Sequence, residues 1–401
     1  MTRGSRRARL LVPVLLAAGL LLTGCTAGAS GTAPVGSSAP VRAASAPPAP
    51  APSVSTAPTA DGRAAALVAA MTPDERAGQL LMTAATVPDL HGLAAAVRRY
   101  HLAGVMIRGR SGGGTAAVAR ALVPVRAAAP ADLPLLTATD QEGGTVQVLS
   151  GPGFSAIPSA VQQGRGSTAA TRADGERWGR ELARAGVRLD LAPVADVPCA
   201  DTLQDNPPVA NLRRQYSSDP AAAGGHVAAF IRGMAAAGVG TTVKHFPGLG
   251  CVRENTDTDR RVVDTETTVD SVRLRSFSAG LDAGAGFVMM SSAEYSRIDP
   301  GVPALFSSRI VQGLLRGRLG FTGVVMSDDL GGAAAVDRWS SGQRAVKFVR
   351  AGGDLLLDIV PADLGPMHEA LVREAAADPA FSAALTAAAE RVVAARIRLA
   401  G

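Results

Sequence analysis

Cysteine, histidine, lysine and aromatic residues are all scarce in this chain. Its 401 residues include three cysteines and five histidines, and only 3% are aromatic. Three cysteines are too few for a disulfide-rich scaffold. No Cys-x-x-Cys pair occurs and the histidines lack the spacing of metal ligands, so we expect neither a metal nor another cofactor. Arginine replaces lysine at almost every basic position, as is typical of a GC-rich genome.

Acidic residues are missing from the N-terminal segment, and this absence accounts for most of the basic charge. The formal net charge is +6. Arg3, Arg6, Arg7 and Arg9 supply four positive charges ahead of the first acidic residue. The rest of the chain is nearly neutral, so it contains no extended basic region and we expect no nucleic-acid partner.

An apolar run from Leu10 to Leu22 follows these arginines. The run is shorter than the roughly 20 residues of a membrane-spanning helix but has the length of a signal-peptide core. It leads into Leu-Thr-Gly-Cys, which resembles the lipobox of bacterial lipoproteins. We therefore interpret residues 1–24 as a signal peptide. We expect an exported protein on the extracytoplasmic side, anchored to the cell membrane by a lipid on Cys25. A plain secretory signal is the alternative.

Residues 25–62 consist almost entirely of Ala, Pro, Ser, Thr, Gly and Val. Such a segment buries too little apolar surface to fold, so we expect an extended tether. Residues 63–401 then form the folded part of the protein. Hydrophobic residues make up 47% of the chain, which is enough for a packed core.

The folded part alternates short apolar runs with Ala-rich amphipathic segments, such as Arg172–Ala185 and Ala221–Ala237. Apolar strands separated by helices indicate a buried parallel sheet, and eight of them predict a single (β/α)8 TIM barrel. An open doubly wound sheet is the alternative, although no Gly-rich phosphate loop follows the first run. The eight runs are Gly78–Met82, Ala103–Ile107, Leu133–Thr137, Val187–Leu191, Gly240–Val243, Gly286–Met290, Gly323–Met326 and Gly353–Leu357.

Charged residues recur just after five of these runs. In a barrel these positions meet at one mouth, where active sites lie. A helix cap or an ion pair explains any one of them, but the recurrence favours a shared site. The residues are Asp140 and Glu142, Asp196, Lys244 and His245, Glu294, and Asp328 and Asp329.

Three motifs in this region resemble those of a known family. Asp140–Gly144 reads DQEGG, Lys244–Gly250 reads KHFPGLG and Val325–Leu330 reads VMSDDL. In this order and spacing they resemble glycoside hydrolase family three, in its single-domain β-N-acetylglucosaminidase branch. The resemblance covers nearly all of residues 65–400.

The resemblance implies roles for five residues. Asp328 would be the nucleophile of a retaining hydrolysis, which forms a glycosyl-enzyme that water then releases. Lys244 and His245 would bind sugar hydroxyls. Asp140 would anchor the non-reducing end of the sugar, and Arg214 would bind substrate. Taken alone, Asp328 is also a candidate helix cap and Arg214 a candidate surface ion pair.

The sequence departs from the family pattern at two places. Thr145 and Val148 stand where the family often carries arginines, which leaves the exact sugar open. The family also places its acid/base histidine in an Asp-x-His pair on the loop after the Lys-His motif. Here that stretch reads Asn255-Thr256-Asp257, and no histidine occurs between 246 and 367.

Proton donation to the leaving oxygen is still required, and Asp257 is our candidate for it. Its like charge near Asp328 would raise its pKa, as a general acid needs. Glu254 and Asp259 are the fallback candidates, and an unreactive turn is the alternative. Because a carboxylate base repels phosphate, we expect hydrolysis rather than phosphorolysis.

Two cysteines remain beyond the lipobox. Cys199 follows the fourth run and Cys251 follows the fifth, so their loops are neighbours in a barrel. Thiols oxidise outside the cytoplasm, and we therefore predict a Cys199–Cys251 disulfide that steadies the loop carrying Asp257. Two free thiols are the alternative.

The leading functional expectation is a monomeric exo-glycosidase acting on terminal β-linked N-acetylglucosamine, with peptidoglycan fragments as its carbohydrate substrate. A β-glucosidase-like hydrolase of the same fold is one alternative. A catalytically weak or dead lipoprotein that binds cell-wall sugars is the other.

Overall fold

The computed structural model describes residues 59–400, in which eight parallel strands form a ring. The order around the ring is β12-β9-β7-β6-β3-β2-β1-β13, and a bridge between Met326 and Leu355 joins its two ends. The predicted (β/α)8 barrel is therefore confirmed. The strands are β1 (Leu81–Ala85), β2 (Gly104–Ile107), β3 (Leu136–Thr139), β6 (Leu189–Asp190), β7 (Gly240–Phe246), β9 (Phe287–Met290), β12 (Val324–Ser327) and β13 (Leu356–Asp358).

Each predicted strand overlaps an observed strand, although the ends shift. The largest shift is at the first strand, which was predicted at Gly78–Met82 and forms at Leu81–Ala85. A capping box explains the difference. The Thr72 hydroxyl accepts the Glu75 backbone N–H, and the Glu75 carboxylate accepts the Thr72 N–H. This box starts helix α2 (Pro73–Gly78), which takes up the beginning of the predicted strand.

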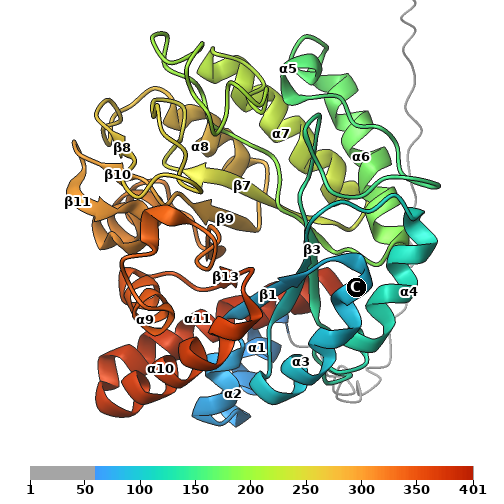
Figure 1. The fold of residues 1–401 in the computed structure, drawn as a ribbon, viewed down its shortest axis with the longest axis vertical. Helices are drawn as coiled ribbons and strands as arrows, with labels where there is room; N and C mark the ends of the chain where they lie inside the picture. Colours follow the sequence, from blue (N-terminus) through green and yellow to red (C-terminus); the bar gives the residue numbers. More distant parts are fainter. Residues whose placement is uncertain (1–58, 401) are drawn as a thin grey trace, which may run out of the picture. The chain divides into compact units, whose positions relative to one another are not determined.

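Helices lie on the outside of the strands (Figure 1). The two helices predicted by residue range form as α6 (Thr168–Arg184) and α7 (Pro220–Ala236). Helix α1 (Ala60–Ala70) begins slightly before the predicted boundary at 63, because the Thr59 hydroxyl accepts the Gly62 N–H. The other α-helices are α3 (Ala94–Tyr100), α4 (Gly114–Arg126), α5 (Ala160–Gln163), α8 (Leu274–Asp282), α9 (Ser341–Ala351), α10 (Leu364–Ala377) and α11 (Pro379–Ala400). Shorter or irregular helices are η1 (Val87–Leu93), η2 (Ala304–Phe306), the π-helix η3 (Arg309–Arg318), η4 (Ala334–Val336) and η5 (Pro361–Asp363).

The core has two layers. Side chains that point into the ring, such as Met82, Leu136 and Met326, form one buried cluster. Side chains that point outward, such as Leu81 and Val325, pack against the helices in a second and larger cluster. Successive residues of a strand therefore point into opposite layers, because side chains alternate between the two faces of a strand.

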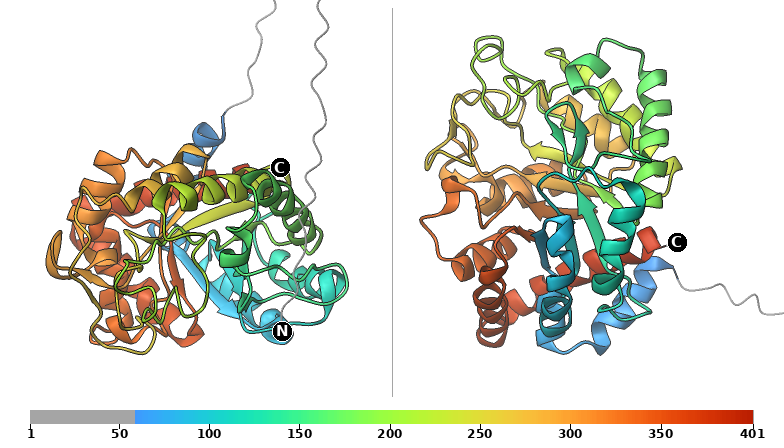
Figure 2. Two further views of the ribbon diagram at one scale, coloured as in Figure 1. Left: turned by 90° about the horizontal axis from the view of Figure 1, so that it is seen from above. Right: turned by 45° about the vertical axis from the view of Figure 1, so that its right-hand side comes forward.

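Helix α11 closes the amino-terminal end of the barrel (red in Figure 2). Val392 and Ala395 belong to the same buried cluster as the side chains inside the ring, and Leu399 packs against it. The fit is close at the start of β7, where a Cβ on Gly240 would lie 2.9 Å from Leu399 Cδ1. The last described helix thus seals the floor of the barrel.

The carboxyl ends of the strands carry additional structure. The sequence analysis expected a helix directly after each strand. Instead, β3 leads into a hairpin of β4 (Gln141–Gly143) and β5 (Val146–Gln147), and segments after β7 and β9 join in a three-stranded sheet. That sheet contains β8 (Val263–Asp264), β10 (Glu294–Tyr295) and β11 (Asp299–Pro303). Within residues 59–400, none of the helices combines the length and apolar character needed to cross a bilayer.

Candidate active site

A cavity of about 530 Å³ opens among the loops at the carboxyl ends of the strands. A larger cavity, about 840 Å³, lies at the opposite end of the barrel beside α11. We assign the site to the carboxyl-end cavity, because barrel active sites lie at that end and the ionisable groups converge there. It brings together all six residues predicted for catalysis or sugar binding: Asp140, Arg214, Lys244, His245, Asp257 and Asp328.

Lys244, near the end of β7, is buried between two carboxylates. Its Nζ lies 2.6 Å from Asp140 Oδ1 and 2.7 Å from Glu142 Oε1. Burial alone would lower the pKa of Lys244, but the charges of Asp140 and Glu142 raise it above its ordinary value. The lysine is therefore held charged at the wall of the cavity, and it fixes the Asp140 carboxylate beside it.

Glu142 joins Lys244 to Arg214. Arg214 Nε donates to Glu142 Oε2 at 2.9 Å and Arg214 Nη2 donates to Glu142 Oε1 at 2.7 Å, which is a two-pronged pair. Burial would raise the pKa of Glu142, but the charges of Arg214 and Lys244 lower it to about 2. The sequence analysis gave Glu142 no role of its own. The structure shows that its carboxylate orients both cations.

His245 is held by Asp196, which follows β6. Asp196 Oδ2 lies 2.8 Å from His245 Nδ1, and Asp196 Oδ1 accepts the backbone N–H groups of His245 and Leu249 at 3.2 and 2.8 Å. Arg214 Nη2 lies 3.4 Å from His245 Nε2. Because a guanidinium only donates, this contact assigns the proton to Nδ1. Asp196 thus fixes the ring and leaves Nε2 facing the cavity.

Asp328 directly follows β12, and its surroundings are buried. Its Oδ1 accepts the Asp329 N–H at 2.9 Å. The preceding Ser327 hydroxyl accepts the Leu357 N–H at 2.9 Å, which ties the end of β12 to β13. Burial raises the pKa of Asp328, and the charge of Asp257 raises it further. The sequence analysis expected a neighbouring like charge to raise the pKa of the acid, Asp257. In the structure, the pKa that this like charge raises is that of the nucleophile, Asp328.

Asp329 shapes the loop after Asp328. Its carboxylate accepts the backbone N–H groups of Gly331, Gly332 and Ile359 at 2.9 to 3.0 Å. All of its oxygen atoms are therefore engaged with backbone. The Asp329 carboxylate therefore orients this loop, and Asp328 is the carboxylate that is open to a reacting sugar.

Asp257 is exposed and lines the same cavity as Asp328. Its backbone N–H donates to Asn255 Oδ1 at 3.1 Å. Its carbonyl accepts the Ala334 N–H at 3.3 Å, and the Thr256 carbonyl accepts the Ala335 N–H at 3.1 Å. The loop of the candidate acid is therefore bound to the loop that follows the candidate nucleophile.

The two fallback acids are placed differently. Asp259 Oδ2 accepts the Asn255 N–H at 3.0 Å and so stabilises the turn itself. Glu254 is exposed and does not belong to the cavity lining. Of the three candidate acids, Asp257 is the one that faces the site.

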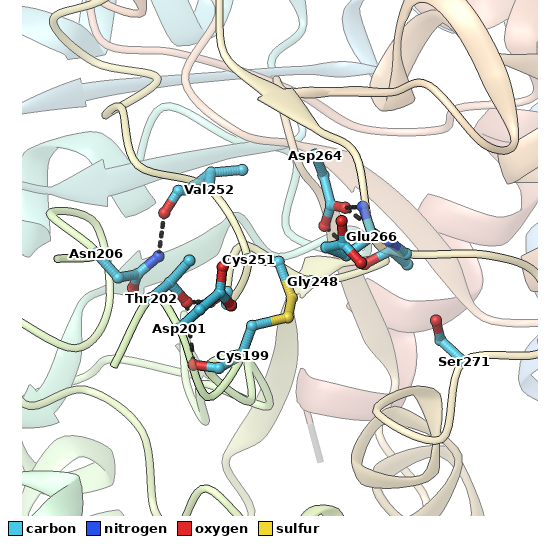
Figure 3. The surroundings of a disulfide bond; sticks show 12 residues. Cys199, Asp201, Thr202, Asn206, Gly248, Cys251, Val252, Asp264, Glu266 and Ser271 are labelled. Atoms are coloured by element: carbon cyan, nitrogen blue, oxygen red, sulfur yellow. Dashed lines mark hydrogen bonds between the residues drawn. A yellow bond between two sulfur atoms is a disulfide. The ribbon is translucent and has the colours of Figure 1, made fainter. Parts of the chain in front are cut away.

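Cys199 and Cys251 lie at the base of this loop, with their sulfurs bonded and their Cα atoms 5.0 Å apart (Figure 3). Asn206 Nδ2 donates to the carbonyls of Leu249 and Val252 at 2.8 Å each. The two loops approach so closely that a Cβ on Gly250 would lie 1.9 Å from the Val197 carbonyl oxygen. Whether the purified protein contains this bond stays a prediction. Cys25 lies outside the described residues.

One buried carboxyl group was missed altogether. Asp190, at the end of β6, accepts the Gln141 N–H at 3.0 Å through Oδ1, while its Oδ2 is buried without a hydrogen-bond partner in the described chain. Burial raises its pKa to about 8. The signal was an aspartate inside the apolar run Val187–Leu191, since aspartate is rarely fully buried without a specific reason.

The geometry matches what the comparison with known proteins finds. The family model "Glycosyl hydrolase family 3 N terminal domain" matches residues 72–395. The chain belongs to glycosyl hydrolase family 3. A curated relative, the Beta-hexosaminidase of Xanthomonas campestris pv. campestris (strain B100), is 36% identical over 267 residues, which are 64% of this chain and 76% of that protein. The resemblance stated from the motifs is therefore confirmed.

Solved structures of glycosyl hydrolase family 3 members agree. The β-N-acetylhexosaminidase from Beutenbergia cavernae DSM 12333 is 45% identical with a TM-score of 0.79, covering 81% of this chain and 98% of that chain. The glycoside hydrolase family 3 β-N-acetylglucosaminidase from Paenibacillus sp. str. FPU-7 is 27% identical with a TM-score of 0.73, covering 83% of this chain and 64% of that chain.

Proposed function

We propose that this chain is a retaining exo-glycosidase that hydrolyses terminal β-linked N-acetylglucosamine. The observation that carries the proposal is the single cavity shared by Asp328, Asp257 and the Asp140–Lys244 pair. Relatives of this chain are named β-hexosaminidase and β-N-acetylhexosaminidase, and these names support N-acetylglucosamine as the sugar. The cluster around Lys244 supplies fixed donors and acceptors for its hydroxyl groups.

The reaction has two displacements. An Asp328 oxygen forms a bond to the anomeric carbon while the bond to the leaving oxygen breaks, and the Asp257 carboxyl donates its proton to that oxygen. Water then attacks the glycosyl-enzyme, the Asp257 carboxylate accepts the proton, and the bond to Asp328 breaks. Because the base is anionic, we propose that water rather than phosphate is the acceptor.

A panel of aryl glycosides tests this proposal. We expect release of nitrophenol from the β-N-acetylglucosaminide, and little from the β-glucoside. Asp328→Asn should lower turnover by about 10³-fold or more, because the covalent step is lost. In an Asp257→Ala variant, which keeps Asp328 but lacks the base that activates water, the glycosyl-enzyme should accumulate, and mass spectrometry should locate the sugar on the peptide that contains Asp328. A preference for the β-glucoside, or an Asp328→Asn variant with unchanged turnover, would contradict the proposal.

We also propose that the protein acts outside the cytoplasm as a monomer on peptidoglycan fragments, held to the membrane through a lipid on Cys25. The support is the sequence of residues 1–62 together with a cavity built from one chain. Cys25→Ser should move the protein from the membrane fraction to the medium, and an unchanged distribution would reject the anchor.

A further inference from the structure

Arg108 directly follows β2 and lines the catalytic cavity. Its side chain is exposed, and it forms no ion pair or hydrogen bond with any residue of the described chain. Its backbone is fixed, because its N–H donates to the Ala85 carbonyl at 3.0 Å. The result is a guanidinium on a rigid strand end, pointing into the space where the substrate binds.

The other two strong cations of the cavity are already engaged. Lys244 is paired with Asp140 and Glu142, and Arg214 is paired with Glu142. Arg108 lies beside Asp140, because Ile107 is in register with Thr139 on the neighbouring strand. Asp140 is nevertheless held by Lys244 at 2.6 Å. Among the described residues, Arg108 is thus the lining cation whose charge no carboxylate compensates.

The position of β2 in the ring decides which part of the substrate meets Arg108. In the strand order, β2 lies three strands from β7 and three strands from β12. Asp257 follows β7 and Asp328 follows β12, so both lie across the mouth from Arg108. Since the anomeric carbon must reach Asp328, Arg108 faces the opposite side of the terminal sugar, where the substituents of C3, C4 and C6 lie. Of these, O6 is carried on an exocyclic carbon and so extends furthest from the ring.

We propose that Arg108 binds a sulfate or phosphate ester on O6 of the terminal sugar, and so selects an acidic substrate class. The proposal rests on the proposed function. A guanidinium fork forms paired, charge-assisted hydrogen bonds with such oxyanions. Arg110, two residues further on, is not available for this, because it donates to the carbonyls of Thr145 and Gln147 at 2.8 and 3.3 Å. It instead fixes the β4–β5 hairpin beside Arg108.

The test compares an aryl β-N-acetylglucosaminide with its 6-sulfate and 6-phosphate, all with the same aryl group. The full-length protein should hydrolyse at least one ester with a higher kcat/KM than the neutral substrate. Arg108→Gln should lower kcat/KM for that ester by about 10-fold or more through KM, because a charge-assisted pair is lost, and leave the neutral substrate within about 2-fold. Arg120→Gln, a matched change at an exposed arginine on α4, should alter neither.

A binding measurement separates this proposal from the proposed function. In the Asp328→Asn background, N-acetylglucosamine 6-sulfate or 6-phosphate should bind more tightly than N-acetylglucosamine, and the added Arg108→Gln change should abolish the difference. If no aryl glycoside is turned over, the proposed function is rejected. The binding measurement then still tests whether Arg108 binds the ester group. Equal effects of Arg108→Gln on charged and neutral ligands, or weaker binding of both esters, would overturn the proposal. An effect confined to disaccharides whose leaving sugar carries a carboxylate would overturn it as well.

Discussion

Asp257 and Asp328 come from loops after different strands, yet they line one cavity and their loops are joined by backbone hydrogen bonds. The two carboxyl groups also have different surroundings. Asp328 is half-buried, whereas Asp257 is exposed. A proton donor is usually the more enclosed carboxyl group of such a pair. Asp257 therefore meets this requirement only when a bound sugar covers it.

At the residue scale, Asp257→Ala should affect substrates according to their leaving group. We expect turnover of a disaccharide to fall by roughly 10²- to 10⁴-fold, because its leaving oxygen needs a proton. A nitrophenyl glycoside should form the glycosyl-enzyme more readily, since nitrophenolate leaves unprotonated. Added azide should then restore turnover and yield a β-glycosyl azide, which product analysis detects.

Glu254→Gln is the matched control for Asp257, because Glu254 lies on the same loop outside the cavity lining. It should leave both substrates unaffected. If Asp257→Ala retained full activity on the disaccharide, the assignment of the acid would be wrong. His245, held by Asp196, would then be the remaining titratable group beside Asp328.

At the residue scale, prediction from the sequence succeeded for side chains that belong to a motif. It failed for side chains whose role depends on a contact with a distant part of the chain. The motifs located Asp140, Lys244 and Asp328 at the mouth. The link through Glu142 depends on how the hairpin after β3 turns back toward β7, and no local pattern contains that geometry. The burial of Asp190 likewise follows from the packing of the complete barrel.

At the element scale, the loop between β7 and α8 is held at its base by the bond between Cys199 and Cys251. Replacing both cysteines by alanine should lower the free energy of unfolding by roughly 2–4 kcal/mol, because the unfolded chain gains freedom. Urea unfolding measures the difference. We expect turnover at 25 °C to persist, since Asn206 still holds the loop through two backbone carbonyls.

Reducing agent provides the control for the disulfide. Dithiothreitol should bring the wild-type protein to the stability of the double variant and leave the double variant unchanged. The prediction fails if both thiols can be alkylated in the purified protein without reductant.

Element-scale prediction was more accurate for strands than for their connections. Each strand carries its own apolar run, so its position can be read locally. The connections after β3, β7 and β9 contain short extra strands. Strands β4 and β5 pair with each other, as do β10 and β11, whereas β8 pairs with β10 across the whole of α8 and β9. A pattern search that assumes one helix after each strand therefore misses them.

At the scale of the whole molecule, buried carboxyl groups give stability an unusual dependence on pH. Burial raises the pKa of Asp190 to about 8 and of Asp358 to about 7, whereas their unfolded values are near 4. The folded state therefore keeps protons that the unfolded state releases, and stability falls as pH rises from about 4 to 8. Glu142, with a pKa of about 2, acts in the opposite direction, because its stabilisation is lost below about pH 4.

We therefore expect the free energy of unfolding to be highest near pH 4–5 and to decline toward pH 8, by at most roughly 5 kcal/mol for Asp190 and roughly 4 kcal/mol for Asp358. The midpoint of thermal unfolding should fall with it. Asp190→Asn should reduce this decline and stabilise the protein more at pH 8 than at pH 5. Asp132→Asn, at an exposed position, should leave the profile unchanged. Calorimetry across this range provides the measurement, and a wild-type midpoint that does not change between pH 5 and 8 would contradict the argument.

Helix α11 follows all eight strands in the chain, and yet it forms the floor on which they pack. The first strand also pairs with the last, with Leu81 opposite Leu356. A chain that emerges amino-terminus first, from a ribosome or through an export channel, therefore cannot complete its interior until α11 has appeared. The native barrel is therefore delayed until synthesis or transport of this segment is finished.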